Sequence, residues 1–93
     1  MGTTTSTTSS GPQTFGISVS NFQFSPANRT ITVGDTIVWS FTGGTHTTTG
    51  NGGVWDSGVR SSGSFSRQFN SAGSFGYVCS IHGSMTGTIT VNP

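Results

Sequence analysis

Apolar and polar residues alternate along most of the chain beyond position 14, and this period of two is typical of β-strands. No window of eleven or more residues carries the period of a helix. Gly, Asn and Ser separate the alternating segments, as expected for turns. The pattern predicts about seven to eight short strands, within residues 14–25, 30–33, 36–41, 54–55, 64–69, 74–79 and 86–91. Strands of this number and spacing favour an all-β domain built as a two-sheet β-sandwich.

The first of these segments changes phase in its middle. Its apolar residues occupy odd positions up to position 19 and even positions from position 22 onward. A change of phase across Ser20 and Asn21 predicts a β-bulge, or a bend that carries the chain into a second sheet. In the next strand, residues 30–33, we expect Ile31 and Val33 to share one face.

Residues 1–13 form a separate region, rich in Ser and Thr and without a run of apolar residues. This composition predicts a flexible leader or linker ahead of a single domain at residues 14–93. No apolar run in the chain approaches the ~20 residues of a membrane span. Because residues 1–13 also lack the apolar core of a signal peptide, we expect any export signal or anchor to lie outside this sequence.

Charged residues are few, since three Arg and two Asp in 93 residues, with no Lys or Glu, give a net charge of +1. This composition excludes a charged helical bundle. It also excludes nucleic acid as a partner, because such a surface needs a basic stripe. The single cysteine excludes an internal disulfide. Aromatic residues make up 11% of the chain, which favours a packed core over disorder.

The residues with metal-binding side chains are concentrated near the C-terminus. Cys79, His82 and Met85 follow one another at intervals of three in a loop between two predicted strands, and His46 lies upstream at the end of another strand. Each residue alone is explained as structural, the sulfur-containing ones as buried apolar side chains and the histidines as loop residues. Together they comprise the only cysteine, both histidines and the only methionine besides Met1. The joint pattern therefore favours a metal site.

The donor set also selects the metal. Two imidazoles, one thiolate and one thioether match the trigonal His₂Cys site with a weak axial Met that binds copper in electron-transfer proteins. Thiolate and thioether sulfur suit Cu(I), whereas imidazole suits both oxidation states. A site between the geometries that the two states prefer requires little rearrangement when one electron moves.

The residues around this pattern resemble those of the cupredoxins, the small blue copper proteins of the plastocyanin, amicyanin and pseudoazurin kind. The resemblance covers residues 15–91 and rests on NFQFSP at 21–26, ITVGDTIVW at 31–39, His46-Thr47, and FGYVCSIHGSMTG at 75–87. The short His-x-x-Met spacing is similar to that of amicyanin. The resemblance implies a Greek-key β-sandwich that holds one type 1 copper ion. Its implied ligands are His46, Cys79, His82 and Met85.

Two positions depart from the pattern of many cupredoxins. Thr47 stands where they have an Asn that joins the two ligand segments by hydrogen bonds, and its hydroxyl has a shorter reach. Ile81 stands where they have Pro, so a backbone N–H is restored near the thiolate sulfur. Because hydrogen bonds near a metal ligand tune the metal, these positions bear on the reduction potential and not on the ligand set.

The function implied is one-electron transfer by a mononuclear copper that cycles between Cu(I) and Cu(II), and not catalysis. Protein groups fill all four ligand positions and leave none for a substrate. The oxidases and nitrite reductases that contain cupredoxin domains need further His ligands, and a dinuclear centre needs a second Cys, which this chain lacks. A copper-storage or delivery module would use the same ligands, and this alternative stays open. A structural, adhesin-like sandwich would leave the Cys, His and Met cluster unexplained.

Partners and location also follow from the resemblance. We expect a redox donor and acceptor protein to dock transiently near His82, whose neighbours Ile81, Gly83, Gly43 and Gly44 are uncharged. Because five scattered charges cannot create a one-signed steering field, docking should be mainly apolar. We also expect the protein to be a monomer. Cupredoxins usually work outside the cytoplasm, which predicts a periplasmic or extracellular location.

Overall fold

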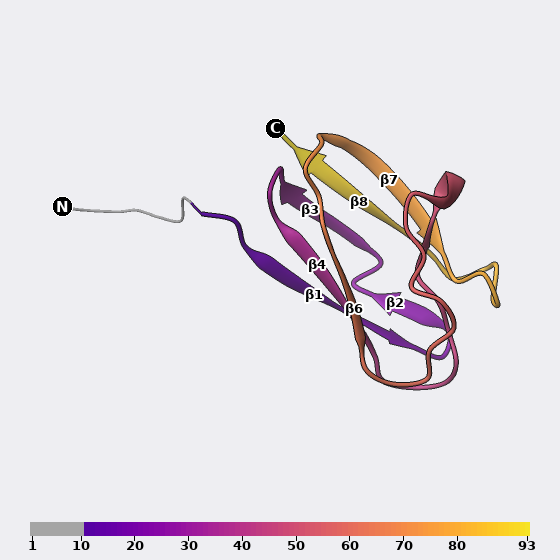
Figure 1. Ribbon diagram of the computed structural model, residues 1–93. Coiled ribbons are helices and arrows are strands. Elements are labelled where there is room, and N and C mark those ends of the chain that lie inside the picture. Colours follow the sequence, from indigo (N-terminus) through magenta and orange to yellow (C-terminus); the bar gives the residue numbers. More distant parts are fainter. Residues whose placement is uncertain (1–10) are drawn as a thin grey trace.

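The computed structural model describes residues 11–93. Eight strands form two four-stranded sheets that pack face to face (Figure 1). They are β1 (Thr14–Ser20), β2 (Gln23–Ser25), β3 (Asn28–Thr32), β4 (Thr36–Phe41), β5 (Thr49–Gly50), β6 (Ser64–Gln68), β7 (Gly73–Val78) and β8 (Thr86–Asn92), with a short 3₁₀ turn, η2 (Asn51–Gly53), after β5. The predicted all-β sandwich is confirmed. Residues 1–10, most of the predicted leader, lie outside the described residues, so the domain boundary stays a prediction.

Each sheet contains both antiparallel and parallel neighbours. The first sheet has the order β2-β1-β4-β6 and the second the order β3-β8-β7-β5. β1 is parallel to β4, with Ile17 opposite Trp39, and β3 is parallel to β8, with Ile31 opposite Val91. Parallel neighbours need a crossover connection. Here each crossover connection contributes at least one strand to the other sheet, which links the two sheets into one unit.

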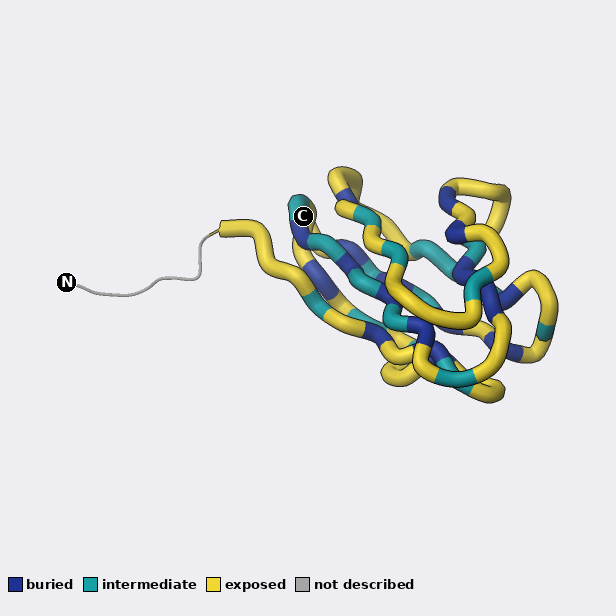
Figure 2. Tube along the Cα trace, turned by 60° about the horizontal axis from the view of Figure 1, so that its bottom comes forward, coloured by how far each residue is buried: buried dark blue, intermediate teal, exposed yellow. Residues whose placement is uncertain are grey.

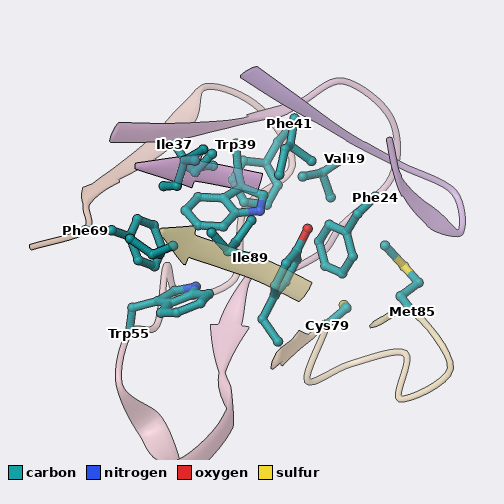
Figure 3. Packing of buried hydrophobic residues seen from close by; sticks show 14 residues of the cluster. Val19, Phe24, Ile37, Trp39, Phe41, Trp55, Phe69, Cys79, Met85 and Ile89 are labelled. Atoms are coloured by element: carbon teal, nitrogen blue, oxygen red, sulfur yellow. The ribbon is translucent and has the colours of Figure 1, made fainter. Parts of the chain in front are cut away.

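The inward positions of both sheets fill one hydrophobic core. On β4, Ile37, Trp39 and Phe41 are buried while the residues between them are half-buried. Buried positions likewise alternate with exposed or half-buried ones in β1 and β8, and Figure 2 shows buried residues spread among exposed ones over the described part of the chain. The ring centroid of Trp39 lies 5.5 Å from those of Trp55 and Tyr77, so large aromatic rings occupy the centre of this core (Figure 3). The alternation in the sequence therefore reflects one buried face on each sheet.

The change of phase in the first segment arises from a hairpin, so the prediction of a bulge or a second sheet is wrong. β1 and β2 are antiparallel neighbours in the same sheet, with Ser20 opposite Gln23 and Val19 opposite Phe24. Residues 21–22 form the turn between them. Across a two-residue turn, an odd position always faces an even one. The apolar pattern therefore changes phase while the buried face stays the same.

Two smaller predictions are also wrong. The strand predicted at residues 30–33 ends at Thr32, so Val33 lies in the turn after β3 and does not share a face with the buried Ile31. Residues 54–55 form no strand, since Val54 is exposed and only Trp55 is buried. The Trp55 indole N–H donates to Thr48 Oγ1 at 3.0 Å, so this side chain anchors the loop to the core without a strand.

Two connections meet at one end of the sandwich. One leads out of β4 through residues 42–48, and the other joins β7 to β8 through residues 79–85. Figure 1 shows the β7–β8 connection at the end of the molecule opposite the C-terminus. These connections carry all the predicted metal ligands. Within residues 11–93, no helix is long and apolar enough to cross a membrane.

Candidate metal centre

The β7–β8 connection turns tightly on its own backbone. The Cys79 N–H donates to the Met85 carbonyl at 3.0 Å, which pairs the first residue of the loop with the last. Between them, the His82 N–H donates to the Cys79 carbonyl at 3.1 Å, and the Met85 N–H donates to the His82 carbonyl at 2.8 Å. The interval of three residues in the sequence is therefore the repeat of two successive backbone turns.

His46 reaches the same place from the other connection. Its backbone forms an isolated antiparallel bridge with Arg60, through two N–H to carbonyl hydrogen bonds of 2.9 Å, and its side chain is fully buried. His46 Nε2 lies 2.9 Å from the carbonyl oxygen of Gly43. Because a carbonyl can only accept, Nε2 must carry the proton, and Nδ1 keeps a free lone pair. This Nδ1 faces the sulfur of Cys79.

The donor atoms of the two histidines and the cysteine converge. Cys79 Sγ lies 3.9 Å from His46 Nδ1 and 3.6 Å from His82 Nδ1, and the three donor atoms all lie within 4.8 Å of one another. A metal bonded to nitrogen at ~2.0 Å and to sulfur at ~2.3 Å holds a nitrogen and the sulfur about 3.5–3.7 Å apart, for bond angles between tetrahedral and trigonal. The two observed sulfur–nitrogen separations lie within about 0.2 Å of this range, so one metal ion fits between the three side chains with a small adjustment.

Met85 occupies the fourth predicted position. Its side chain is buried, and Figure 3 shows it beside Cys79 at one end of the core, with Trp55 and Phe69 at the other. The structure thus brings all four predicted residues to the same end of the sandwich. The role of Met85 as a weak axial ligand stays a prediction.

Thr47 connects the two segments that carry the predicted ligands. Its N–H donates to Cys79 Sγ at 3.4 Å, and its hydroxyl accepts a hydrogen bond of 2.9 Å from the Ser80 N–H. The same hydroxyl lies 2.9 Å from that of Thr49 and 3.1 Å from that of Ser80. Thr47 therefore joins the segments despite its short reach. Within the described residues, the backbone donor to the sulfur is Thr47, and the expected hydrogen bond from Ile81 is not formed.

Two further residues contact the site from the turn between β1 and β2. Asn21 Oδ1 lies 3.0 Å from His46 Nε2, and the ring of Phe22 meets that of His82 edge-on, with 4.9 Å between centroids. Neither residue was predicted from the sequence to belong to the site. No periodicity along the chain can place a turn against a histidine 25 residues away. The one available signal was the change of phase across Ser20 and Asn21, which marked this point as irregular.

The part of the core beside the candidate metal ligands is apolar. Tyr77 lies on β7 two residues before Cys79, its ring packs on Phe24, and its hydroxyl donates to the Ala27 carbonyl at 3.2 Å. Burial raises the pKa of Tyr77 to about 12, and the neighbouring Trp39 indole acts in the opposite direction. Surroundings of low polarity that disfavour a tyrosinate also strengthen the attraction between a thiolate and a bound cation.

No family model matches the sequence, and no curated protein matches it. The fold, by contrast, is similar to several solved structures. A purple cupredoxin from Nitrosopumilus maritimus matches with a TM-score of 0.74 and 25% identity, over 83% of this chain and 98% of the other. The oxidised form of an amicyanin variant matches with a TM-score of 0.76 and 21% identity, over 90% and 85%. A copper-containing nitrite reductase from Thermus scotoductus SA-01 gives 0.75 and 21%, over 88% of this chain but 22% of that protein.

These similarities define the class of fold. The domain has the cupredoxin fold, which confirms the structural expectation drawn from its sequence motifs. His46, Cys79 and His82, together with Met85, form a candidate type 1 copper site at one end of this fold.

Proposed function

We propose that this protein is a one-electron carrier that binds one type 1 copper ion through His46, Cys79, His82 and Met85. When bound, copper supplies a reversible one-electron change between Cu(I) and Cu(II). The observation that carries the proposal is the convergence of one sulfur and two Nδ1 atoms at separations that a single ion spans. The donor set is the one that selects copper for electron transfer.

The scaffold supports this function because hydrogen bonds from the surrounding backbone hold the donors. The backbone bridge to Arg60 and the carbonyl of Gly43 fix His46 from two sides. The Thr47 N–H holds the sulfur of Cys79, and the loop around that cysteine is closed by its own hydrogen bonds. Donor atoms held in this way keep one geometry for both oxidation states, so little rearrangement accompanies electron transfer.

A carrier fits the donor set better than an enzyme does. Protein side chains supply all four proposed donors, which leaves no ligand position for a substrate. The chain corresponds to 22% of the nitrite reductase that it resembles, so that similarity concerns the fold of one part of a larger protein. We propose no catalytic activity for this domain.

Electrons would enter and leave through His82, which is partly exposed, whereas His46 is fully buried. The side chains of Ile81 and Phe22 beside it are 47% and 63% exposed. Donor and acceptor redox proteins would therefore dock transiently on an apolar surface. A periplasmic or extracellular location, where copper proteins of this fold usually work, belongs to the same proposal.

Copper titration of the reduced, metal-free protein tests the function. We expect an intense visible thiolate-to-Cu(II) band that saturates at one equivalent of copper, and reversible voltammetry of the loaded protein. Absence of the band would refute a type 1 site. A band combined with loss of copper at each reduction would instead favour the copper-storage or delivery module.

A further inference from the structure

The turn between β1 and β2 contacts both candidate ligand histidines. We propose that Asn21 and Phe22 form a positioning element, in which Asn21 fixes the ring of His46 and Phe22 fixes the ring of His82. This inference deepens the copper site proposed above and rests on it. It adds two residues that are not themselves ligands and that hold the imidazoles ready for the metal.

Asn21 acts on the nitrogen of His46 that faces away from the sulfur. Nε2 lies 3.0 Å from Asn21 Oδ1 and 2.9 Å from the Gly43 carbonyl oxygen. The Gly43 carbonyl requires a proton on Nε2, so Asn21 presents its amide oxygen, and one N–H faces two acceptors. A hydrogen bond at the distal nitrogen sets the tautomer and ring orientation of a metal-binding histidine and raises its basicity. Asn21 therefore favours the tautomer that leaves Nδ1 free.

The chain leaves room for this contact at Gly44. Its φ of +79° lies in the left-handed region, and a Cβ there would collide with Asn21 Oδ1 and lie 2.8 Å from His46 Nε2. Glycine thus allows the backbone to pass close enough for the side chains of Asn21 and His46 to meet. Both segments therefore accommodate the contact, one through the Asn21 side chain and the other through the missing side chain of Gly44.

Phe22 acts on the other histidine. Its ring lies 4.9 Å from that of His82 at an interplanar angle of 68°, and 6.2 Å from that of His46 at 88°. Phe22 is 63% exposed, so burial in the core does not explain where this large apolar side chain lies. The position of Phe22 is explained by its edge-on contact with His82. In this contact the phenyl ring limits the orientations open to the partly exposed imidazole.

The hairpin holds the backbone of both residues in the turn. Ser20 and Gln23 pair on either side of the turn, so the backbone that carries Asn21 and Phe22 is held by the first sheet. The candidate ligands themselves come from the two other connections. Three separate segments therefore define the positions of the imidazoles.

The test compares Asn21→Ala and Phe22→Ala with two controls in the full chain. Gln23→Ala changes the exposed residue next to the turn, and Val59→Ala removes an apolar side chain that is 66% exposed and lies outside the turn. Nitrogen-15 NMR of the histidine rings in the metal-free protein reports the tautomer directly. We expect a single Nε2–H tautomer for His46. Asn21→Ala leaves the Gly43 carbonyl as the acceptor at Nε2, so this tautomer should persist while the His46 ring becomes more mobile in NMR relaxation. Asn21→Asp, which keeps an acceptor oxygen, should restore the wild-type mobility.

Metal affinity and ring mobility provide the second readout. We expect Zn(II), a probe without redox chemistry, to bind about tenfold more weakly to Asn21→Ala and to Phe22→Ala, with no change in the two controls. Phe22→Ala should also increase the mobility of the His82 ring in NMR relaxation, and Phe22→Tyr should restore it. If Asn21→Ala fails to fold, Asn21→Asp and the tautomer of His46 in the wild-type protein decide the role of Asn21. If Phe22→Ala fails to fold, the mobility of the His82 ring in Phe22→Tyr decides the role of Phe22.

A mixture of tautomers in the wild-type protein, or wild-type mobility of the His46 ring in Asn21→Ala, would overturn the role of Asn21. If Phe22→Ala bound zinc as tightly as the wild-type protein and left the mobility of the His82 ring unchanged, the role of Phe22 would be overturned. Neither result depends on copper chemistry. A wild-type protein that shows no blue band would refute the proposed function, while the NMR result on the metal-free protein would still decide whether the turn positions the rings.

Discussion

The hydroxyl of Thr47 accepts a hydrogen bond of 2.9 Å from the backbone N–H of Ser80. Thr47 directly follows one candidate ligand, His46, and Ser80 directly follows another, Cys79. One short side chain therefore sets the separation of the two connections that build the site. Thr47 is buried whereas Ser80 is exposed, so this hydrogen bond is part-buried.

Replacing Thr47 by Val should therefore lower the free energy of unfolding of the metal-free protein. The substitution removes the acceptor of the part-buried hydrogen bond from the Ser80 N–H, and a hydrogen bond contributes about 0.5–1.5 kcal/mol. Urea denaturation measures the change. Thr30→Val, on the exposed face of β3, is the matched control and should change stability by much less. Equal effects of the two substitutions would show that the Thr47 hydroxyl does not join the segments.

Replacing Cys79 by Ser should abolish the intense visible absorption and weaken copper binding, while the domain stays folded. Cys79 supplies the only thiolate, whereas the core is formed mainly by aromatic and aliphatic side chains elsewhere. Absorption and circular dichroism spectra measured on the same sample separate the two effects. A variant that remained intensely blue would remove Cys79 from the site.

Replacing Met85 by Leu should preserve copper binding and colour but raise the reduction potential. A lost neutral donor destabilises Cu(II) more than Cu(I), and Leu still fills the buried space that Met85 occupies. Voltammetry of both proteins in the same buffer measures the shift. An unchanged potential would place the thioether away from the metal.

Partner docking should depend little on salt. Each of the three arginines lies over an aromatic ring, with Arg29 4.3 Å from the Phe15 ring, so cationic side chains are engaged elsewhere and not gathered at His82. Screening over ~8 Å then removes little attraction. Electron self-exchange and partner association, followed by stopped flow, should change little up to physiological ionic strength. Ile81→Lys should slow both. A tenfold fall with salt, or normal rates in the variant, would contradict apolar docking.

Stability should fall at alkaline pH because of Tyr77. Its pKa is raised by burial from 10.0 to about 12, so the unfolded chain releases this proton at a lower pH than the folded protein does. The contribution of Tyr77 is therefore complete below pH 10 and is lost as the pH rises from 10 to about 12. The loss is about 2–3 kcal/mol of unfolding free energy.

Urea denaturation on both sides of pH 10 measures this loss, and the single tyrosine makes its absorbance titration unambiguous. Tyr77→Phe is the control. It also loses the hydrogen bond to Ala27, so it should be less stable at neutral pH but should show a weaker dependence on alkaline pH. Parallel pH profiles of the two proteins would show that another group causes the loss.

Much of the fold and of the candidate site could be predicted from the sequence. The predicted and observed bounds of β4, residues 36–41, are identical, because a strand with one buried face imposes alternation on its own residues. The spacing of Cys79, His82 and Met85 identified the loop, since that interval is the repeat of local backbone turns. The scarcity of charge is likewise a property of composition alone.

Only the tertiary structure decided which surfaces meet. It showed that the change of phase after β1 is a hairpin, that Trp55 is buried without a strand, and that the Thr47 N–H is the donor to the sulfur. It also brought Asn21 and Phe22 to the histidines. The contacts of Thr47 with Cys79, and of Asn21 and Phe22 with the histidines, join residues that are distant in the chain and become close only in the folded domain. A local pattern records which residues are apolar, but the neighbours that each will contact depend on how the sheets pack.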